Sequence, residues 1–134
     1  MSLRFKKTFK NPVLFLLIGT ALLFSQCKKD PTKMEIRIVE LSTGAAVANS
    51  EITLFVDSSS TTGFFVCDEG FINEKKYVTN ANGQTTECFD TPALLNVTVI
   101  SYFPAVGGGT TQKFGTGKLN LIEHETTSLT ISVN

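Results

Sequence analysis

The side chains best suited to metal chemistry are His124 and its neighbours Glu123 and Glu125. In an extended strand, successive side chains point to opposite faces, so the two carboxylates would point away from the imidazole. Three such groups cannot close on one ion. The pattern therefore predicts an exposed edge or turn residue at His124 and no metal site.

A second acidic group lies near the two later cysteines and consists of Asp68, Glu69 and Asp90. Calcium takes several oxygen ligands, but no loop here has EF-hand spacing, so a solvated acidic loop is favoured. Nucleophilic catalysis needs a base beside a Ser or Cys, and the chain has one His and no Gly-x-Ser-x-Gly. The sequence predicts no catalytic residue, no cofactor and no enzyme activity.

The chain has three cysteines, Cys27, Cys67 and Cys88, and no Cys-x-x-Cys. Two cysteines in an exported domain with a single His favour a disulfide over a metal site. A Cys67–Cys88 bridge would close a loop of about 22 residues and stabilise the fold by roughly 3 kcal/mol. Two separate buried thiols are the alternative.

Residues 1–26 have the pattern of an export signal. Four basic residues and no acid precede a run of twelve almost wholly apolar residues, Val13 to Phe24. A basic start followed by an apolar stretch of about 7–15 residues is typical of a secretory signal. The run is shorter than the roughly 20 residues that a membrane-spanning helix needs. A buried core helix is the alternative.

The residues Phe24-Ser25-Gln26-Cys27 resemble the lipobox of bacterial lipoproteins, and Lys28-Lys29-Asp30 follow as in the Bacteroidota type. Phe24 and Gln26 depart from the Leu and the Gly or Ala that the box prefers. The resemblance implies that Cys27 becomes the lipidated N-terminus, with palmitate-type acyl chains. Residues 27–33 would then be the lipidated Cys and a tether. An ordinary soluble secretory signal is the alternative.

Cleavage before Cys27 would leave 108 of the 134 residues, enough for one domain. That part keeps eight of the 12 basic residues and all 12 acidic residues, so its net charge is −4. A mildly acidic domain without a basic cluster is a poor candidate for binding nucleic acid.

Residues 34–134 read as strands throughout. Met34, Ile36 and Ile38 alternate with Glu35 and Arg37, which is typical of a half-buried strand. Further strands are predicted at Ile52 to Val56, Phe64 to Cys67, Tyr77 to Thr79, Gln84 to Phe89, Leu94 to Phe103, Lys118 to Ile122 and Thr127 to Val133. The Asn80–Gly83 turn should make Gln84 to Phe89 the partner of the strand before it, and Leu94 to Phe103 should be central with both faces partly covered. The pattern predicts an all-β antiparallel sandwich of about seven or eight strands.

The order of these pieces resembles the prealbumin-like sandwiches, including carboxypeptidase regulatory-like domains. The matching residues are Ile36 to Val39, Thr43-Gly44, Ala45 to Val47, Ile52 to Val56, Thr79 to Gly83 and Val97 to Pro104. The family's one enzyme class, the hydroxyisourate hydrolases, uses several His residues, an Arg and a C-terminal Tyr-Arg-Gly-Ser, which this chain lacks. An immunoglobulin-like sandwich is the competing fold.

These features predict a membrane-anchored lipoprotein that serves as a non-catalytic binding or structural module of the cell envelope. The expected location is the outer membrane, at its periplasmic face or at the cell surface, with a protein or glycan partner. Three loops are the expected contact surfaces: Asp57 to Gly63, Asp68 to Lys75 and Ala105 to Gln112. The alternative function is a periplasmic accessory or inhibitor subunit of an envelope enzyme.

Overall fold

A computed structural model of the chain describes residues 29–56 and 63–134. Within these ranges the protein is all-β and contains no helix. The nine strands found there are β1 (Thr32–Glu40), β2 (Glu51–Phe55), β3 (Phe64–Val66), β4 (Gly70–Ile72), β5 (Glu74–Val78), β6 (Gln84–Phe89), β7 (Ala93–Pro104), β8 (Thr110–Leu121) and β9 (Thr126–Val133). The signal segment, Cys27 and residues 57–62 lie outside the described residues.

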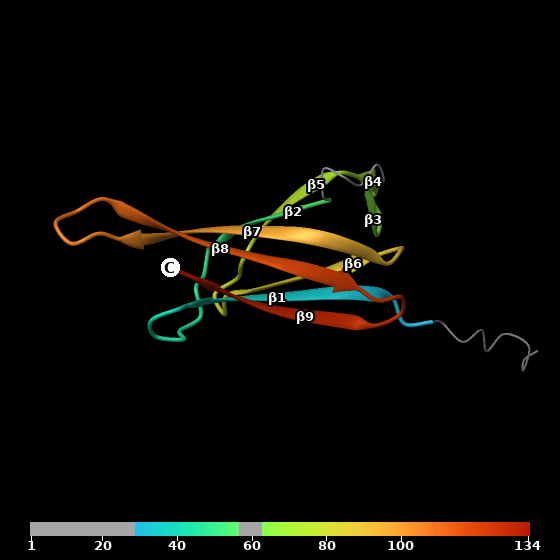
Figure 1. Ribbon diagram of the computed structural model, residues 1–134, viewed down its shortest axis with the longest axis horizontal. Coiled ribbons are helices and arrows are strands. Elements are labelled where there is room, and N and C mark those ends of the chain that lie inside the picture. The colour runs from blue at the N-terminus through green and yellow to red at the C-terminus, as the bar shows by residue number, and fades with distance from the viewer. Residues whose placement is uncertain (1–28, 57–62) are drawn as a thin grey trace, which may run out of the picture.

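The strands form two sheets that pack face to face, as Figure 1 shows. One sheet has the order β4-β3-β6-β1-β9 and the other has the order β5-β2-β7-β8. All strand pairs are antiparallel except β1 with β9, which is parallel. The predicted all-β sandwich is therefore confirmed, with one or two more strands than expected.

Alternation of apolar and polar residues places the core between the sheets. In β1 the apolar side chains of Met34, Ile36 and Ile38 are buried while Glu35 and Arg37 point to solvent. The same alternation in β2, β7 and β9 supplies most of the remaining core. β1 begins at Thr32, two residues before the predicted start, because Thr32 is buried and its hydroxyl accepts a hydrogen bond from the His124 amide at 3.0 Å.

The Asn80–Gly83 turn is present, but the prediction that it joins partner strands is wrong. Gly83 donates to the Asn80 carbonyl at 2.9 Å and has a φ of 69°. β5 pairs with β2 in one sheet, whereas β6 pairs with β1 in the other. The turn residues specify a chain reversal, but the sheet that each strand joins is decided by burial of its inner face.

Two of the predicted loops contain strand residues. β8 starts at Thr110, so the stretch Ala105 to Gln112 is a turn plus the first residues of a twelve-residue strand. The stretch Asp68 to Lys75 contains β4 and the start of β5. β4 forms because Phe65 and Phe71 pair across the β3–β4 hairpin with ring centroids 5.2 Å apart.

β7 is central as predicted, lying between β2 and β8, but its outer face is less covered than expected. Leu95, Val97 and Val99 on its inner face are buried. On the outer face Leu94 is 63% exposed and Tyr102 is 46% exposed. Among the described residues, no element packs over this side of the sheet.

β8 and β9 close one side of the sandwich through two inward-facing glycines. A Cβ at Gly115 would lie 2.7 Å from Ile131 Cγ2 and 2.9 Å from the Ser132 carbonyl oxygen. At one end of this seam, Phe114 and Asn134 exchange two backbone hydrogen bonds of 3.1 and 3.2 Å, which join the two sheets. Glycine is needed here because the backbones and side chains approach so closely.

The predicted Cys67–Cys88 disulfide is present, with the two Cα atoms 5.4 Å apart. It links the end of β3 to β6, and the Cys67 amide also donates to the Cys88 carbonyl at 3.0 Å. β3 shares only one registered pair with β6, Val66 with Phe89. The disulfide therefore reinforces the weakest strand pairing of this sheet.

Candidate functional site

The start of β1 and the β7–β8 turn lie at opposite ends of the molecule. At one end, Thr32 is registered with Phe89, and Phe89 is registered with Val66, so β1 begins beside the β3–β4 hairpin. At the other end, the β7–β8 hairpin extends well beyond the rest of the sandwich, as Figure 1 shows. We call residues 102–112 of this hairpin the arm.

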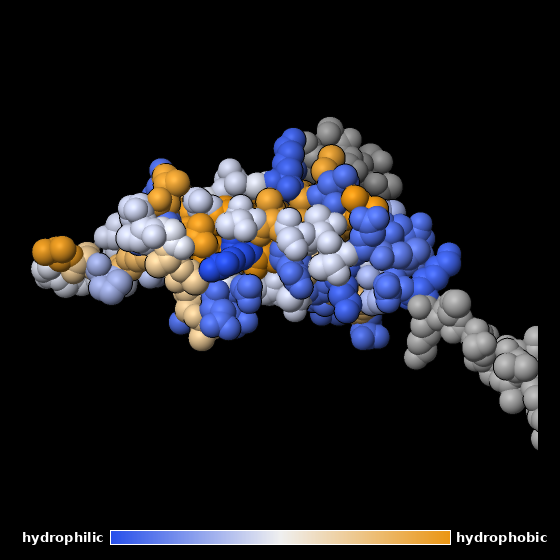
Figure 2. Space-filling view, turned by 90° about the horizontal axis from the view of Figure 1, so that it is seen from below, coloured by the Kyte–Doolittle hydropathy of each residue, from blue (hydrophilic) through white to orange (hydrophobic). Residues whose placement is uncertain are grey.

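The arm carries no charged residue. β2 pairs with β7 only as far as Ile100, so β7 and β8 pair only with each other along the arm. At the tip, Val106 is fully exposed with a relative accessibility of 108%. Figure 2 shows this apolar tip separated from the charged surface that gathers at the opposite end. The arm is thus an uncharged two-stranded ribbon with two open edges.

Polar contacts fix the base of the arm to the sandwich. Ser101 is buried and its hydroxyl lies 2.6 Å from that of Ser50 in the adjacent segment. Lys113 forms an ion pair with Glu40 at the end of β1, and its ammonium lies 4.5 Å from the centre of the Phe103 ring. Hydrogen bonds from Lys113 and Thr43 lower the pKa of Glu40, so this carboxylate stays ionised.

A row of three apolar residues, interrupted by the exposed Glu51, crosses the outer face of the second sheet next to the arm. The registered row runs from Val78 on β5 through Glu51 on β2 and Ile100 on β7 to Phe114 on β8. Val78 and Phe114 are exposed. Tyr102 lies two residues further along β7 on the same face. Apolar surface therefore continues from the sheet onto the arm.

The opposite end carries His124 and its two glutamate neighbours, and no group of three or more possible metal ligands occurs in the described part of the chain. His124 lies in a turn with a φ of 63°, its Nδ1 is 2.8 Å from the Asp30 carbonyl oxygen, and its Nε2 is 3.3 Å from a Glu123 carboxylate oxygen. The prediction of an exposed turn residue is confirmed.

Sequence reasoning did not identify a polar cluster between the sheets at the β5–β6 side. Lys75 forms ion pairs with Glu69 and, at 3.2 Å, with Glu87. Burial alone would lower the pKa of Lys75, but hydrogen bonds from its ammonium to these two carboxylates raise it. The one hint in the sequence was Glu87, a charged residue on the face of β6 that also carries the apolar Phe89.

Tyr77 completes the cluster, with its ring 5.2 Å from the Lys75 ammonium. Its hydroxyl oxygen is buried and has no hydrogen-bond partner among the described residues. Burial and the nearby Glu87 raise the pKa of Tyr77 above its usual value. A protonated Lys and a neutral Tyr give this cluster a structural role in joining the sheets, with neither group poised as a base.

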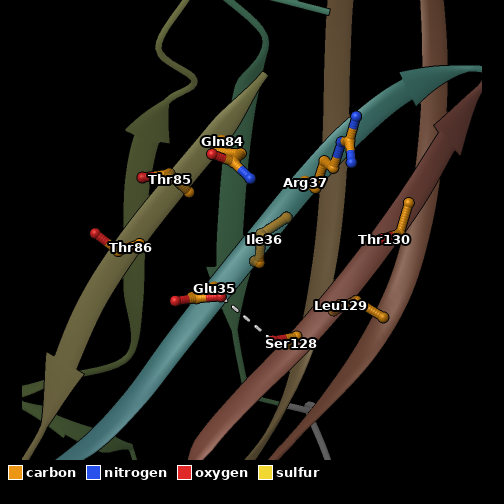
Figure 3. Close-up of a pocket in the computed structure, with 9 residues that line it drawn as sticks. All are labelled: Glu35, Ile36, Arg37, Gln84, Thr85, Thr86, Ser128, Leu129 and Thr130. Carbon is orange, nitrogen blue, oxygen red and sulfur yellow. Dashed lines mark hydrogen bonds between the residues drawn. The ribbon is translucent and has the colours of Figure 1, made fainter. Parts of the chain in front are cut away.

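A shallow hollow of about 210 Å³ lies on the outer face of the first sheet. Figure 3 shows the residues that line it, which come from β6, β1 and β9. Two registered rows cross it: Thr86–Glu35–Ser128 and Gln84–Arg37–Thr130. Arg37 makes no ion pair within the described ranges. Seven of its nine lining residues are polar, and the Ser128 hydroxyl donates to a Glu35 carboxylate oxygen at 3.4 Å, as the dashed line in Figure 3 marks.

No protein-family model, curated protein or solved structure matches this chain. In the described residues, no helix is long and apolar enough to cross a membrane.

Proposed function

We propose that this protein is a lipid-anchored, non-catalytic binding or structural module of the bacterial envelope, built on a prealbumin-like sandwich. The observation that carries the proposal is the separation of the two ends. The N-terminal segment, with its lipobox-like Cys27, leads into one end of the sandwich, and the uncharged arm projects from the other.

Lipidation at Cys27 would set the orientation. Thr32 follows Cys27 by five residues, which span at most about 17 Å when fully extended. Two or more acyl chains, at about 0.8 kcal/mol per buried methylene, give stable anchoring without a membrane-spanning helix. The sandwich would then stand close to the outer membrane with the arm as its most distant part.

The arm is the favoured contact surface among the three loops predicted from the sequence. Residues 57–62 of the first loop lie outside the described residues, and the second is largely β4 and β5. The arm combines exposed Tyr102 and Val106 with an absence of charge. Aromatic and apolar residues that lack neighbouring charges are typical of the centre of a protein interface, so a protein partner is favoured over a glycan.

The anchoring is tested with Cys27→Ser, followed by fractionation of cells into membrane and soluble parts. The variant should be released from membranes while the parent chain stays bound. Retention of an uncleaved Cys27→Ser chain in the membrane would disprove the lipoprotein hypothesis. Protease treatment of intact and lysed cells then places the sandwich at the cell surface or in the periplasm.

A second function, an accessory or inhibitor subunit of an envelope enzyme, is favoured by the narrow projecting shape of the arm. A two-stranded ribbon can enter a cleft that a whole sandwich cannot. Co-purification with a hydrolase that loses activity on binding would support this function. Replacing residues 104–110 with a short Asn-Gly turn should then restore the hydrolase.

A further inference from the structure

The open edge of β8 along the arm is a template for an additional strand. Phe114 exchanges both of its backbone hydrogen bonds with Asn134, so its N–H and C=O point away from β7. In an antiparallel pair, alternate residues direct these groups to the same side. The N–H and C=O groups of Gln112 and Thr110 therefore point to this open edge, in line with those of Phe114.

The hydrogen bonds of the β7–β8 turn independently indicate that the backbone groups of Thr110 and Gln112 point to the open edge. Ala105 donates to the Gly109 carbonyl at 3.1 Å, so residues 105 and 109 form a hydrogen-bonded pair. The adjacent registered pair, Pro104 with Thr110, must then be of the non-hydrogen-bonded type. Thr110 and Gln112 have no backbone hydrogen bond outside the β7 pairing in the part of the chain that the structure describes.

The other edges of the two sheets are protected in ways that this edge is not. The edge strand β5 carries Glu74, Lys75 and Lys76, and charges on an edge oppose strand addition. β4 is only three residues long. β9 is covered by β8 along the seam. On the arm's other edge, Pro104 has no N–H to donate.

We propose that the β8 edge of the arm, at Thr110 and Gln112, binds an extended, uncharged segment of another protein as an added antiparallel strand. This proposal rests on the proposed function, for which it names the mode of partner binding. Backbone hydrogen bonds provide affinity in such complexes, and side chains beside the added strand provide selectivity. An uncharged segment fits because the arm has no charge with which to pair one.

A second copy of this chain fits the edge less well. Two β8 edges would pair antiparallel, and since β8 runs along the long axis, the two N-terminal ends would point in opposite directions. Two chains anchored through Cys27 in one membrane stand in the same orientation. A strand from a different protein has no such restriction.

The test appends a hexapeptide of alternating Thr and Val after Asn134, where it would continue the β8–β9 ladder past Phe114. Amide hydrogen exchange is measured residue by residue in the full chain, held in detergent. Exchange at Thr110 and Gln112 should slow by roughly tenfold or more, as expected for newly formed hydrogen bonds. Thr111, whose amide already faces β7, should change little and serves as the internal control.

Variants of the extended chain separate backbone from side-chain effects. Gln112→Pro removes one edge N–H and should return Thr110 to its fast rate, whereas Gln112→Ala keeps the N–H and the protection. A hexapeptide of alternating Lys and Glu should protect less than the uncharged one. Equal protection by the two hexapeptides would refute the requirement for an uncharged segment.

Unchanged exchange at Thr110 and Gln112 in the extended chain would overturn the proposal. Slow exchange at Thr110 and Gln112 in the parent chain that is lost on dilution would show that a second copy binds the edge. This result would also overturn the proposal. Release of Cys27→Ser from membranes does not depend on any of these results, so failure of the edge is distinguishable from failure of the proposed function.

Discussion

Gly115→Ala should destabilise the protein because the seam between β8 and β9 has no room for a methyl group. The new Cβ would lie 2.7 Å from Ile131 Cγ2, 2.9 Å from the Ser132 carbonyl oxygen and 3.1 Å from Val133 Cγ1. One of these three contacts is backbone, which cannot rotate away. Gly115 does not have a positive φ, so alanine is compatible with the local backbone and the cost comes from the contacts alone.

Overpacking of this kind costs about 1–3 kcal/mol. At about 2 kcal/mol, the melting temperature of a domain of this size should fall by roughly 8–16 °C. Gly117→Ala is the matched control, because its Cβ would meet only side-chain carbons of Leu129 and Ile131, at 3.1 to 3.3 Å. These can shift, so a change within about 0.5 kcal/mol is expected.

Thermal and urea unfolding of the parent chain and both variants would measure the difference. The expected signature is a lower midpoint with an unchanged urea dependence of the unfolding free energy. If Gly115→Ala were no less stable than Gly117→Ala, the close approach of β8 to β9 would not be the reason for the glycine. The joining of the sheets through Phe114 and Asn134 would then also need another explanation.

Two further predictions concern the interior on the other side of the sandwich. Replacing both Cys67 and Cys88 with Ala should lower the unfolding free energy by roughly 3 kcal/mol. In urea unfolding, the parent chain under reducing conditions should match the variant. Equal stability of the oxidised parent chain and the variant would contradict this prediction. Tyr77→Phe should raise stability by about 1 kcal/mol, because it removes a buried hydroxyl that has no partner in the described structure. Burial raises the pKa of Tyr77 above its usual 10.0 in the folded state, so the unfolded chain ionises first and the folded protein loses stability as the pH rises above 10. Tyr77→Phe should therefore lose less stability between pH 9 and 11.5, and equal losses in the two proteins would refute the assignment.

The sheet layers were predictable wherever one face of a strand is buried and the other solvated. Alternation in β1, β2 and β9 gave both the strand and its inward face, because a period of two follows directly from the backbone. The disulfide was predictable from cysteine spacing and the expected export of the chain. For the strands, the signal lies within a short window of sequence.

The arm was not predictable, because its first β8 residues look like a loop. Gly107, Gly108 and Gly109 followed by Thr110 and Thr111 have turn composition. Further along β8, Gly115 and Gly117 occupy inward positions where an apolar side chain would have shown the alternation. These glycines are explained only by the close approach of β9, a contact between distant parts of the chain that no local pattern records.

The residues that stabilise the fold and those of the proposed binding edge occupy different parts of β7 and β8. The contact of Ser101 with Ser50 and the ion pair of Lys113 with Glu40 mark the place where the core ends. Residues beyond them pair only with each other, and apart from Phe103, which packs against the core, substitutions in the arm leave the packing between the sheets unchanged. An open, uncharged edge normally promotes aggregation, and natural sheets protect such edges with charge, proline or short length. A charged substitution at Thr110 or Gln112 would remove this risk at no cost to the core, so stability does not account for the uncharged edge, whereas the proposed strand binding would.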